Sequence, residues 1–219
     1  MGVYINSYIY SGGWLPTDEA SLEAWYKKDT GITESGGAVS KWEDQSSNSI
    51  DMKQLSLSEQ PTYGSNVITF DGTQNLESTG QITLTGDFTI GFLINITTFG
   101  DTLLGDNNTN NNLIKFMDNT TIRFKTANGV TDINLDTGTT FSGNDYMVLT
   151  RDSSNVLHLW LNGVLQVDTG TKGAAALIDS IGVRATDIDM FRGTITEIQI
   201  FNSKSTALTT NINTALAAL

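Results

Sequence analysis

Glu197 is the residue whose type and position most directly suggest chemistry. It lies in the middle of RGTITEIQIFN, residues 192–202, which is rich in Thr and Ile and predicts a β-strand. A carboxylate in a half-buried strand is costly unless it has a partner. It could therefore be a catalytic acid, a metal ligand or a hydrogen-bonded part of the scaffold.

Catalysis at Glu197 would need a second carboxyl group. Retaining glycoside hydrolysis uses two carboxyl groups about 5 Å apart. Strand alternation places Ile195 and Gln199 beside Glu197, and neither ionises. We therefore predict that Glu197 is not catalytic and that the protein has no catalytic residue.

The same alternation predicts which face of this strand is buried. Ile198 and Ile200 form the better core face, so Glu197 is expected on the more polar face together with Ile195. A bulge near Thr196 would change this assignment.

Acidic residues elsewhere suggest a Ca²⁺ site, because Ca²⁺ prefers oxygen ligands. The candidate ligands are Asp187 and Asp189, in DIDM; Glu43 and Asp44 form a second acidic pair in WEDQSSNS. Neither acidic pair has the ligand spacing of an EF-hand, and the sequence around each pair is also typical of a turn. For Asp44 we expect side-chain to backbone hydrogen bonds that cap its own loop.

Aromatic and amide side chains suggest sugar binding. Trp160 is the tryptophan whose strand position allows it to face either the core or a cleft, whereas Trp25 and Trp42 are expected in the core. Asn107 and Asn108, in the polar loop GDNNTNNN, could supply amides for a sugar, although a mobile loop explains the same composition. His158 lacks a Ser or Cys partner and is expected to be an ordinary strand residue.

The first fifteen residues differ from the rest of the chain. An alternating aromatic segment precedes Gly12 and Gly13, and it reads either as an edge strand or as an arm that adds a strand to a partner. The predicted partner-binding residues of this arm are Tyr4, Ile5, Tyr8, Tyr10 and Trp14.

Composition restricts the partners. The 219 residues include 12 Lys and Arg against 24 Asp and Glu, a net charge of −12, and the basic residues are scattered. Nucleic acids and anionic membranes both require clustered basic residues, so neither is an expected partner. There is no cysteine, and the start of the sequence lacks the basic and apolar regions of an export signal.

Many short strands must position these residues. DFTIGFLINI, residues 87–96, alternates apolar residues on one face, and VLHLWLNGVLQV, residues 156–167, predicts a hairpin that turns at Asn162-Gly163. Only the C-terminal segment predicts a helix, with an apolar face that consists of Leu208, Ile212, Leu216 and Leu219. The pattern indicates an all-β antiparallel sandwich or jelly roll with a short C-terminal helix.

Several motifs occur in an order that resembles a known family. They are LEAWYKKDTGI, VSKWEDQSSNS, QPTY, FDGTQNLES, DFTIGFLI, LWLNGVLQ and FRGTITEIQIFN. From about Leu22 to the C-terminus the chain resembles the laminin-G-like group of the concanavalin A-like lectin/glucanase superfamily. The resemblance implies a two-sheet jelly roll over residues 16–219, after an arm of residues 1–15. In related sequences an acid recurs in the strand of Glu197, which favours a structural role.

The resemblance leaves the function open, because this fold supports many functions. The arm and the absence of an export signal favour a non-enzymatic phage structural protein. The expectation is a capsid decoration protein on the virion surface, assembled in the host cytoplasm as a homotrimer on the major capsid protein or another virion protein. A carbohydrate-binding adhesin or receptor-binding fibre protein is the alternative, and a glycoside hydrolase is disfavoured. No cofactor is expected apart from the candidate Ca²⁺.

Overall fold

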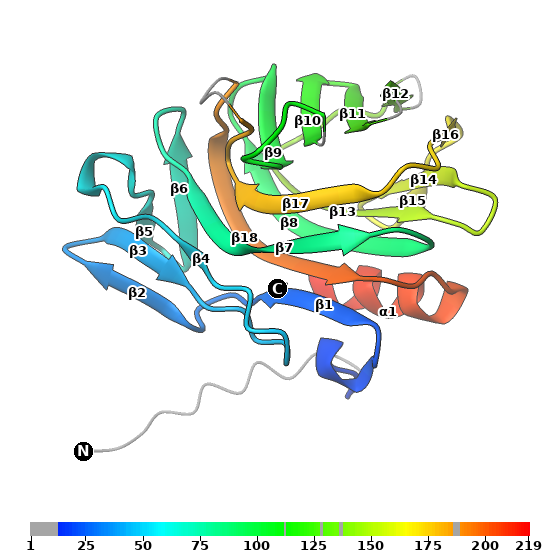
Figure 1. Ribbon diagram of the computed structural model, residues 1–219. Helices are drawn as coiled ribbons and strands as arrows, with labels where there is room; N and C mark the ends of the chain where they lie inside the picture. The colour runs from blue at the N-terminus through cyan, green and yellow to red at the C-terminus, as the bar shows by residue number, and fades with distance from the viewer. Residues whose placement is uncertain (1–12, 112, 128, 136–137, 186–188) are drawn as a thin grey trace.

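The computed structural model describes residues 13–111, 113–127, 129–135, 138–185 and 189–219. These residues form two layers of antiparallel strands with one α-helix on the outside (Figure 1). The predicted all-β sandwich with a C-terminal helix is confirmed.

One layer, here called the helix-side sheet, carries the helix on its outer face. β18 pairs with β1, β6 and β8, and β8 continues through β13 to β14, which pairs with β15 and β16. Its strands are β1 (Leu22–Tyr26), β6 (Val67–Asp71), β8 (Phe88–Ile96), β13 (Asn144–Arg151), β14 (Val156–Leu161), β15 (Val164–Leu165), β16 (Gly170–Thr171) and β18 (Arg192–Phe201).

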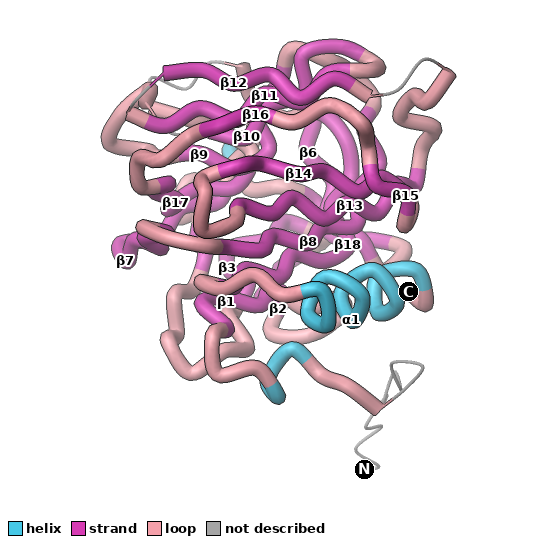
Figure 2. The backbone as a smooth tube through the Cα atoms, turned by 90° about the vertical axis from the view of Figure 1, so that its right-hand side faces the viewer, coloured by secondary structure: helices cyan, strands magenta, loops and turns pink. Residues whose placement is uncertain are grey.

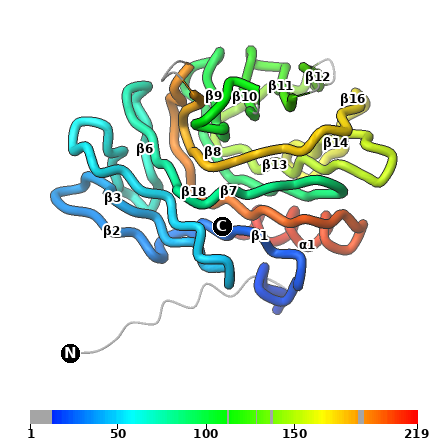
Figure 3. The backbone as a smooth tube through the Cα atoms, viewed as in Figure 1, coloured from blue at the N-terminus to red at the C-terminus, as the bar shows by residue number. Residues whose placement is uncertain are grey.

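The second layer, here called the opposite sheet, runs in the order β4, β7, β17, β9, β10, β11, β12. Figure 3 shows β9, β10, β11 and β12 in succession. Its strands are β4 (Met52–Lys53), β7 (Leu76–Leu84), β9 (Asp101–Gly105), β10 (Leu113–Asp118), β11 (Thr121–Thr126), β12 (Gly129–Asn134) and β17 (Ala176–Ile181). Short strands join the two layers at one side: β2 (Ile32–Ser35), β3 (Ala38–Trp42) and β5 (Thr62–Gly64). Two 3₁₀ turns, Pro16–Asp18 and Leu57–Glu59, complete the described elements.

The main core lies between the two sheets. Phe88 and Phe92 of β8 pack against Phe124 and Phe116 of the opposite sheet, with ring centroids 5.6 and 6.4 Å apart. Apolar alternation in β8 supplies this face, as predicted, because side chains on a strand alternate between the two sides.

A smaller core lies between the helix-side sheet and α1 (Thr206–Ala217), which Figure 2 shows lying across the outer face of the sheet. The predicted helix face is confirmed for Leu208, Ile212 and Leu216, which are buried there, whereas Leu219 lies beyond the end of α1 and is only partly buried. Ser205 begins the helix by accepting a hydrogen bond from Leu208 N at 3.0 Å. Gly91 allows the close approach, because a Cβ at this position would collide with Ile212.

β18 departs from simple alternation. Its pairing with β8 shifts register between Ile195 and Glu197, a β-bulge at the predicted position near Thr196. Ile195 therefore packs in the main core with Ile198 and Ile200, and the expectation that Ile195 shares the face of Glu197 is wrong.

The hairpin prediction at Asn162-Gly163 is confirmed. β14 and β15 pair on either side of this dipeptide, and both residues have positive φ, 51° and 79°. In the part of the chain that the structure describes, no helix is long and apolar enough to cross a membrane.

Candidate functional site

Glu197 is completely buried and fully engaged by the scaffold. Its Oε1 accepts hydrogen bonds from Trp25 Nε1 at 2.8 Å and Gln199 Nε2 at 2.7 Å, and its Oε2 accepts one from Lys28 N at 3.2 Å. A carboxylate with no exposed surface cannot reach a glycan, so this geometry supports the structural interpretation.

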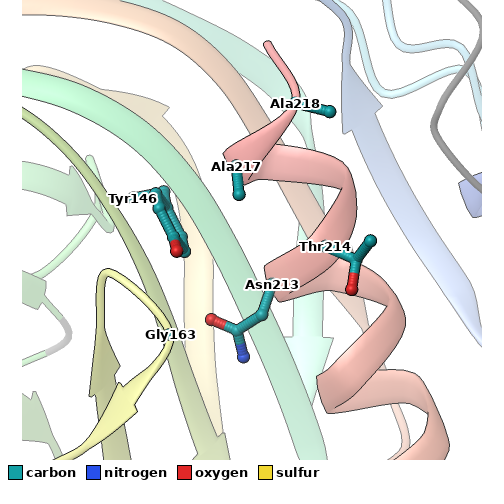
Figure 4. Close-up of a pocket in the computed structure, with 6 residues that line it drawn as sticks. All are labelled: Tyr146, Gly163, Asn213, Thr214, Ala217 and Ala218. Carbon is teal, nitrogen blue, oxygen red and sulfur yellow. The ribbon is translucent and has the colours of Figure 1, made fainter.

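A surface groove opens where α1 passes the β14–β15 hairpin. Its central part has a volume of about 480 Å³ and is lined by Tyr146 of β13, by Gly163 at the hairpin turn, and by Asn213, Thr214, Ala217 and Ala218 at the end of α1. Figure 4 shows the side chains of Tyr146 and Asn213 directed into the space between hairpin and helix.

The groove continues toward the start of α1. A second hollow of about 240 Å³ shares Gly163, Asn213 and Thr214 with the first, and it adds Trp160, Lys204, Thr206, Thr209 and Thr210. Leu157, Leu159 and Leu161 point into the main core, so the alternation of β14 turns Trp160 outward against α1. Trp160, which the sequence left between core and cleft, therefore lines the groove.

The groove also continues toward the end of the chain. A third hollow of about 420 Å³ shares Tyr146 and Ala217 with the first, and its other lining residues include Lys28, Asn66, Asn144 and Thr196. We call the three adjoining hollows together the α1 groove. None of the described residues that line it is an Asp or Glu.

The chemistry of the α1 groove is that of a binding surface. Asn213 Oδ1 is buried and has no hydrogen-bond partner among the described residues, while its Nδ2 donates to Thr209 O at 2.9 Å. Threonine hydroxyls and two aromatic rings could hold a polar ligand that also has apolar faces. A pair of carboxyl groups for acid–base hydrolysis is absent from the described lining.

The predicted sugar-binding amides lie elsewhere. Asn107 and Asn108 follow β9 of the opposite sheet, and their side-chain amides donate to Glu77 at 2.7 Å and to Asp179 at 2.8 Å. The structure thus does not bring them together with Trp160.

Two buried carboxylates lie at the loop that contains Asn107 and Asn108. Asp106 and Asp179 are almost completely buried, and Asp179 also accepts a hydrogen bond from Asn107 N at 2.6 Å. Burial raises the pKa of Asp179, and the nearby negative charge of Asp106 adds to this increase.

The candidate Ca²⁺ ligands are only partly described. Asp187 lies outside the described residues. Asp189 Oδ2 lies 2.6 Å from Lys115 Nζ and 2.6 Å from Arg184 NH2. Although burial opposes it, these two cations hold the pKa of Asp189 below its usual range. The described residues contain no group of three or more metal-ligating side chains, and calcium binding stays a prediction.

The Asp44 prediction is confirmed. Asp44 Oδ1 accepts from Trp25 N and Ser46 N, both at 2.8 Å, and its Oδ2 accepts from Ile50 N at 3.0 Å. Trp25 and Trp42 are buried, as expected.

The predicted arm is described only at its end. Trp14 packs against Phe201 with ring centroids 6.3 Å apart, and its Nε1 donates to Glu19 at 3.0 Å. The remaining predicted arm residues, Tyr4, Ile5, Tyr8 and Tyr10, lie outside the described residues.

Comparison with known proteins defines the class. The chain belongs to the Concanavalin A-like lectin/glucanases superfamily, whose family model matches residues 69–209, more than half of the sequence. No curated protein matches the chain.

Solved structures share the fold at low sequence identity. One is the sialidase of Trypanosoma rangeli in complex with sialic acid, with a TM-score of 0.58 and 16% identity over 92% of this chain and 33% of that chain. Another is the binding domain of Paraclostridial Mosquitocidal Protein 1, with a TM-score of 0.58 and 15% identity over 91% of this chain and 52% of the other. The chain therefore spans about one third to one half of these proteins, and the likeness concerns the fold alone.

Proposed function

We propose that this protein is a non-enzymatic carbohydrate-binding protein whose binding site is the α1 groove. The observation that carries the proposal is the lining itself, where Trp160 and Tyr146 lie beside threonine hydroxyls. Sugars present both C–H faces and hydroxyl groups, and this lining offers a counterpart to each. Membership of a lectin/glucanase superfamily also supports it.

The positions of the carboxylates support binding rather than hydrolysis in this proposal. Glu197 is buried in hydrogen bonds, and the described lining contains no acid. Hydrolysis of a bound glycan by the purified protein would contradict the non-enzymatic part of the proposal.

A glycan array followed by calorimetry tests the site. We expect specific binding of a subset of glycans, and Trp160→Ala should raise the Kd about tenfold, which corresponds to ~1.4 kcal/mol. Trp14→Ala is the matched control, because Trp14 is also partly buried but does not line the groove. Absence of any bound glycan, or equal Kd values for Trp160→Ala and the wild type, would reject the proposal.

Attachment to a virion is a second proposal, and it concerns the arm. The anchoring of Trp14 at Phe201 and Glu19 supports it, since this contact fixes where the preceding residues leave the domain. In this proposal the protein decorates a phage capsid as a homotrimer on the virion surface, and residues 1–13 contact the major capsid protein. Deletion of residues 1–13 should abolish capsid occupancy while the thermal midpoint of the domain stays unchanged; unchanged occupancy rejects the role of the arm.

A further inference from the structure

The charge of the α1 groove differs from that of the whole chain. Acids outnumber bases 24 to 12 in the sequence, yet the described lining contains two lysines, Lys204 and Lys28, and no Asp or Glu. A positive site on a strongly negative protein needs a local cause, because the overall field repels anions.

The two lysines are not equivalent. Lys28 Nζ donates to the backbone oxygen of Leu219 at 3.0 Å, so it is occupied by the end of the chain. Lys204 makes no hydrogen bond or ion pair of its own with any residue that the structure describes. The negative charge of Asp152 also attracts Lys204, but that carboxylate accepts a hydrogen bond from Val156 N at 3.0 Å and lies 3.7 Å from His158 Nε2.

Lys204 also lies where a ligand would feel its charge. It lines the same hollow as Trp160 and the hydroxyls of Thr206 and Thr210, at the turn that enters α1. Lys204 is half-buried beside an apolar ring, and the attraction between unit charges there is stronger than in open solvent.

We propose that the α1 groove binds a glycan that carries an acidic group, a carboxylate or a sulfate, and that Lys204 pairs with this group. The inference rests on the proposed carbohydrate-binding function and specifies the class of ligand. Trp160 supplies the stacking surface next to the acidic group. The exposed hydroxyl oxygen of Thr214, farther along the groove, accepts a hydrogen bond from a hydroxyl of the same chain of sugars.

The length of the α1 groove favours a chain of sugars over a single sugar as its ligand. α1 has 12 residues, and at 1.5 Å per residue it is about 18 Å long. The adjoining hollows accompany it from Lys204 and Thr206 at its start to Ala217 and Leu219 at its end. An acidic oligosaccharide could therefore lie along the helix with its charged residue at the Lys204 end.

The test compares matched glycans on the full-length protein. Oligosaccharides with identical backbones in neutral, carboxylated and sulfated forms are titrated by calorimetry at low and physiological salt. We expect the wild type to bind at least one acidic form about tenfold or more tightly than the neutral form, with a preference that shrinks as salt increases. Carboxylated and sulfated forms distinguish the two sources of charge.

Variants assign the preference to Lys204. Lys204→Gln should bring the ratio of the neutral and acidic Kd values to about one, whereas Lys204→Arg should retain the preference because it keeps the charge. Lys53→Gln is the control, since Lys53 lies on the opposite sheet beside Asp51 and outside the α1 groove.

Three outcomes would overturn the inference. They are equal wild-type affinity for neutral and acidic forms, an undiminished preference in Lys204→Gln, and Lys204-dependent binding of polyglutamate as tight as that of the acidic glycan. Equal affinity for all sugar forms would leave the carbohydrate-binding proposal standing, whereas binding of no sugar at all would remove both.

Discussion

Glu197 shows how one residue can suggest chemistry and yet serve the scaffold. Its three hydrogen-bond donors come from β1, from the residues that follow β1, and from β18 itself, so the carboxylate joins the N-terminal strand to the C-terminal one. The absence of exposed surface separates it from any ligand.

We predict that Glu197→Ala lowers the free energy of unfolding by about 3 kcal/mol, because it leaves buried donors on Trp25 and Gln199 without an acceptor. Urea denaturation measures this loss. Glu59→Ala is the control; this exposed acid should change the free energy of unfolding by less than about 0.5 kcal/mol. Equal effects of the two substitutions would contradict a structural role for Glu197.

Asp179 gives a prediction that depends on pH. Its pKa is raised by burial, so the folded protein binds this proton more tightly than the unfolded chain does. The resulting stabilisation is complete below the ordinary Asp pKa of about 4 and is lost as the pH rises through the raised pKa.

The free energy of unfolding of Asp179→Asn, relative to the wild type, should therefore increase as the pH rises from about 4 toward 7. Asp118→Asn should show the opposite slope at pH values below about 4, because a hydrogen bond from Thr120 N lowers the pKa of Asp118 and its stabilisation is lost only as the pH falls. Denaturation midpoints over a series of pH values check both. A difference for Asp179→Asn that does not change with pH would refute the prediction.

At the scale of elements, α1 determines the candidate site. The helix packs on β8 and β13 through Ile212 and Leu216, and the groove exists because the helix covers only part of the outer face. Gly91 sets how closely α1 approaches β8.

Gly91→Ala should lower the free energy of unfolding by about 2 kcal/mol, because the added methyl group overlaps Ile212 and forces α1 outward. We also expect weaker glycan binding, since α1 forms one wall of the groove. Gly64→Ala, in β5, is the matched control because a methyl group added there would have no atom within 4 Å. If Gly91→Ala unfolds with the same free energy as the wild type in chemical denaturation, the prediction is contradicted and the contact between α1 and β8 is loose.

The same elements show how far the sequence predicts the structure. Alternation in β8, the Asn162-Gly163 turn and the apolar face of α1 are each encoded by neighbouring residues, and all three are found in the structure. The face of Ile195 could not be settled in this way, because the bulge in β18 depends on pairing with β8, about a hundred residues earlier.

At the scale of the whole molecule, the net charge of −12 acts on stability. The 24 acids outnumber the 12 Lys and Arg two to one, so half of the acids have no cation to pair with and like charges repel in the compact state. Salt screens this repulsion.

We predict that raising NaCl from about 10 mM to about 150 mM increases the thermal midpoint at pH 7. The increase should shrink near the sequence pI of about 4.3, where the net charge approaches zero. Differential scanning calorimetry at the two pH values measures both effects, and a decrease in the midpoint with salt at pH 7 would contradict the prediction.

The sequence by itself determined the fold class, the short terminal helix and the family resemblance, because periodicity, turn dipeptides and motif order are local properties of the chain. Only the tertiary structure decided that Trp160 faces α1, that Glu197 is buried, and that Asn107 and Asn108 lie on the other sheet. The groove joins residues from β13, the β14–β15 hairpin and α1, which are far apart in the sequence. Their proximity depends on how the helix packs on the sheet, and no local pattern encodes that contact.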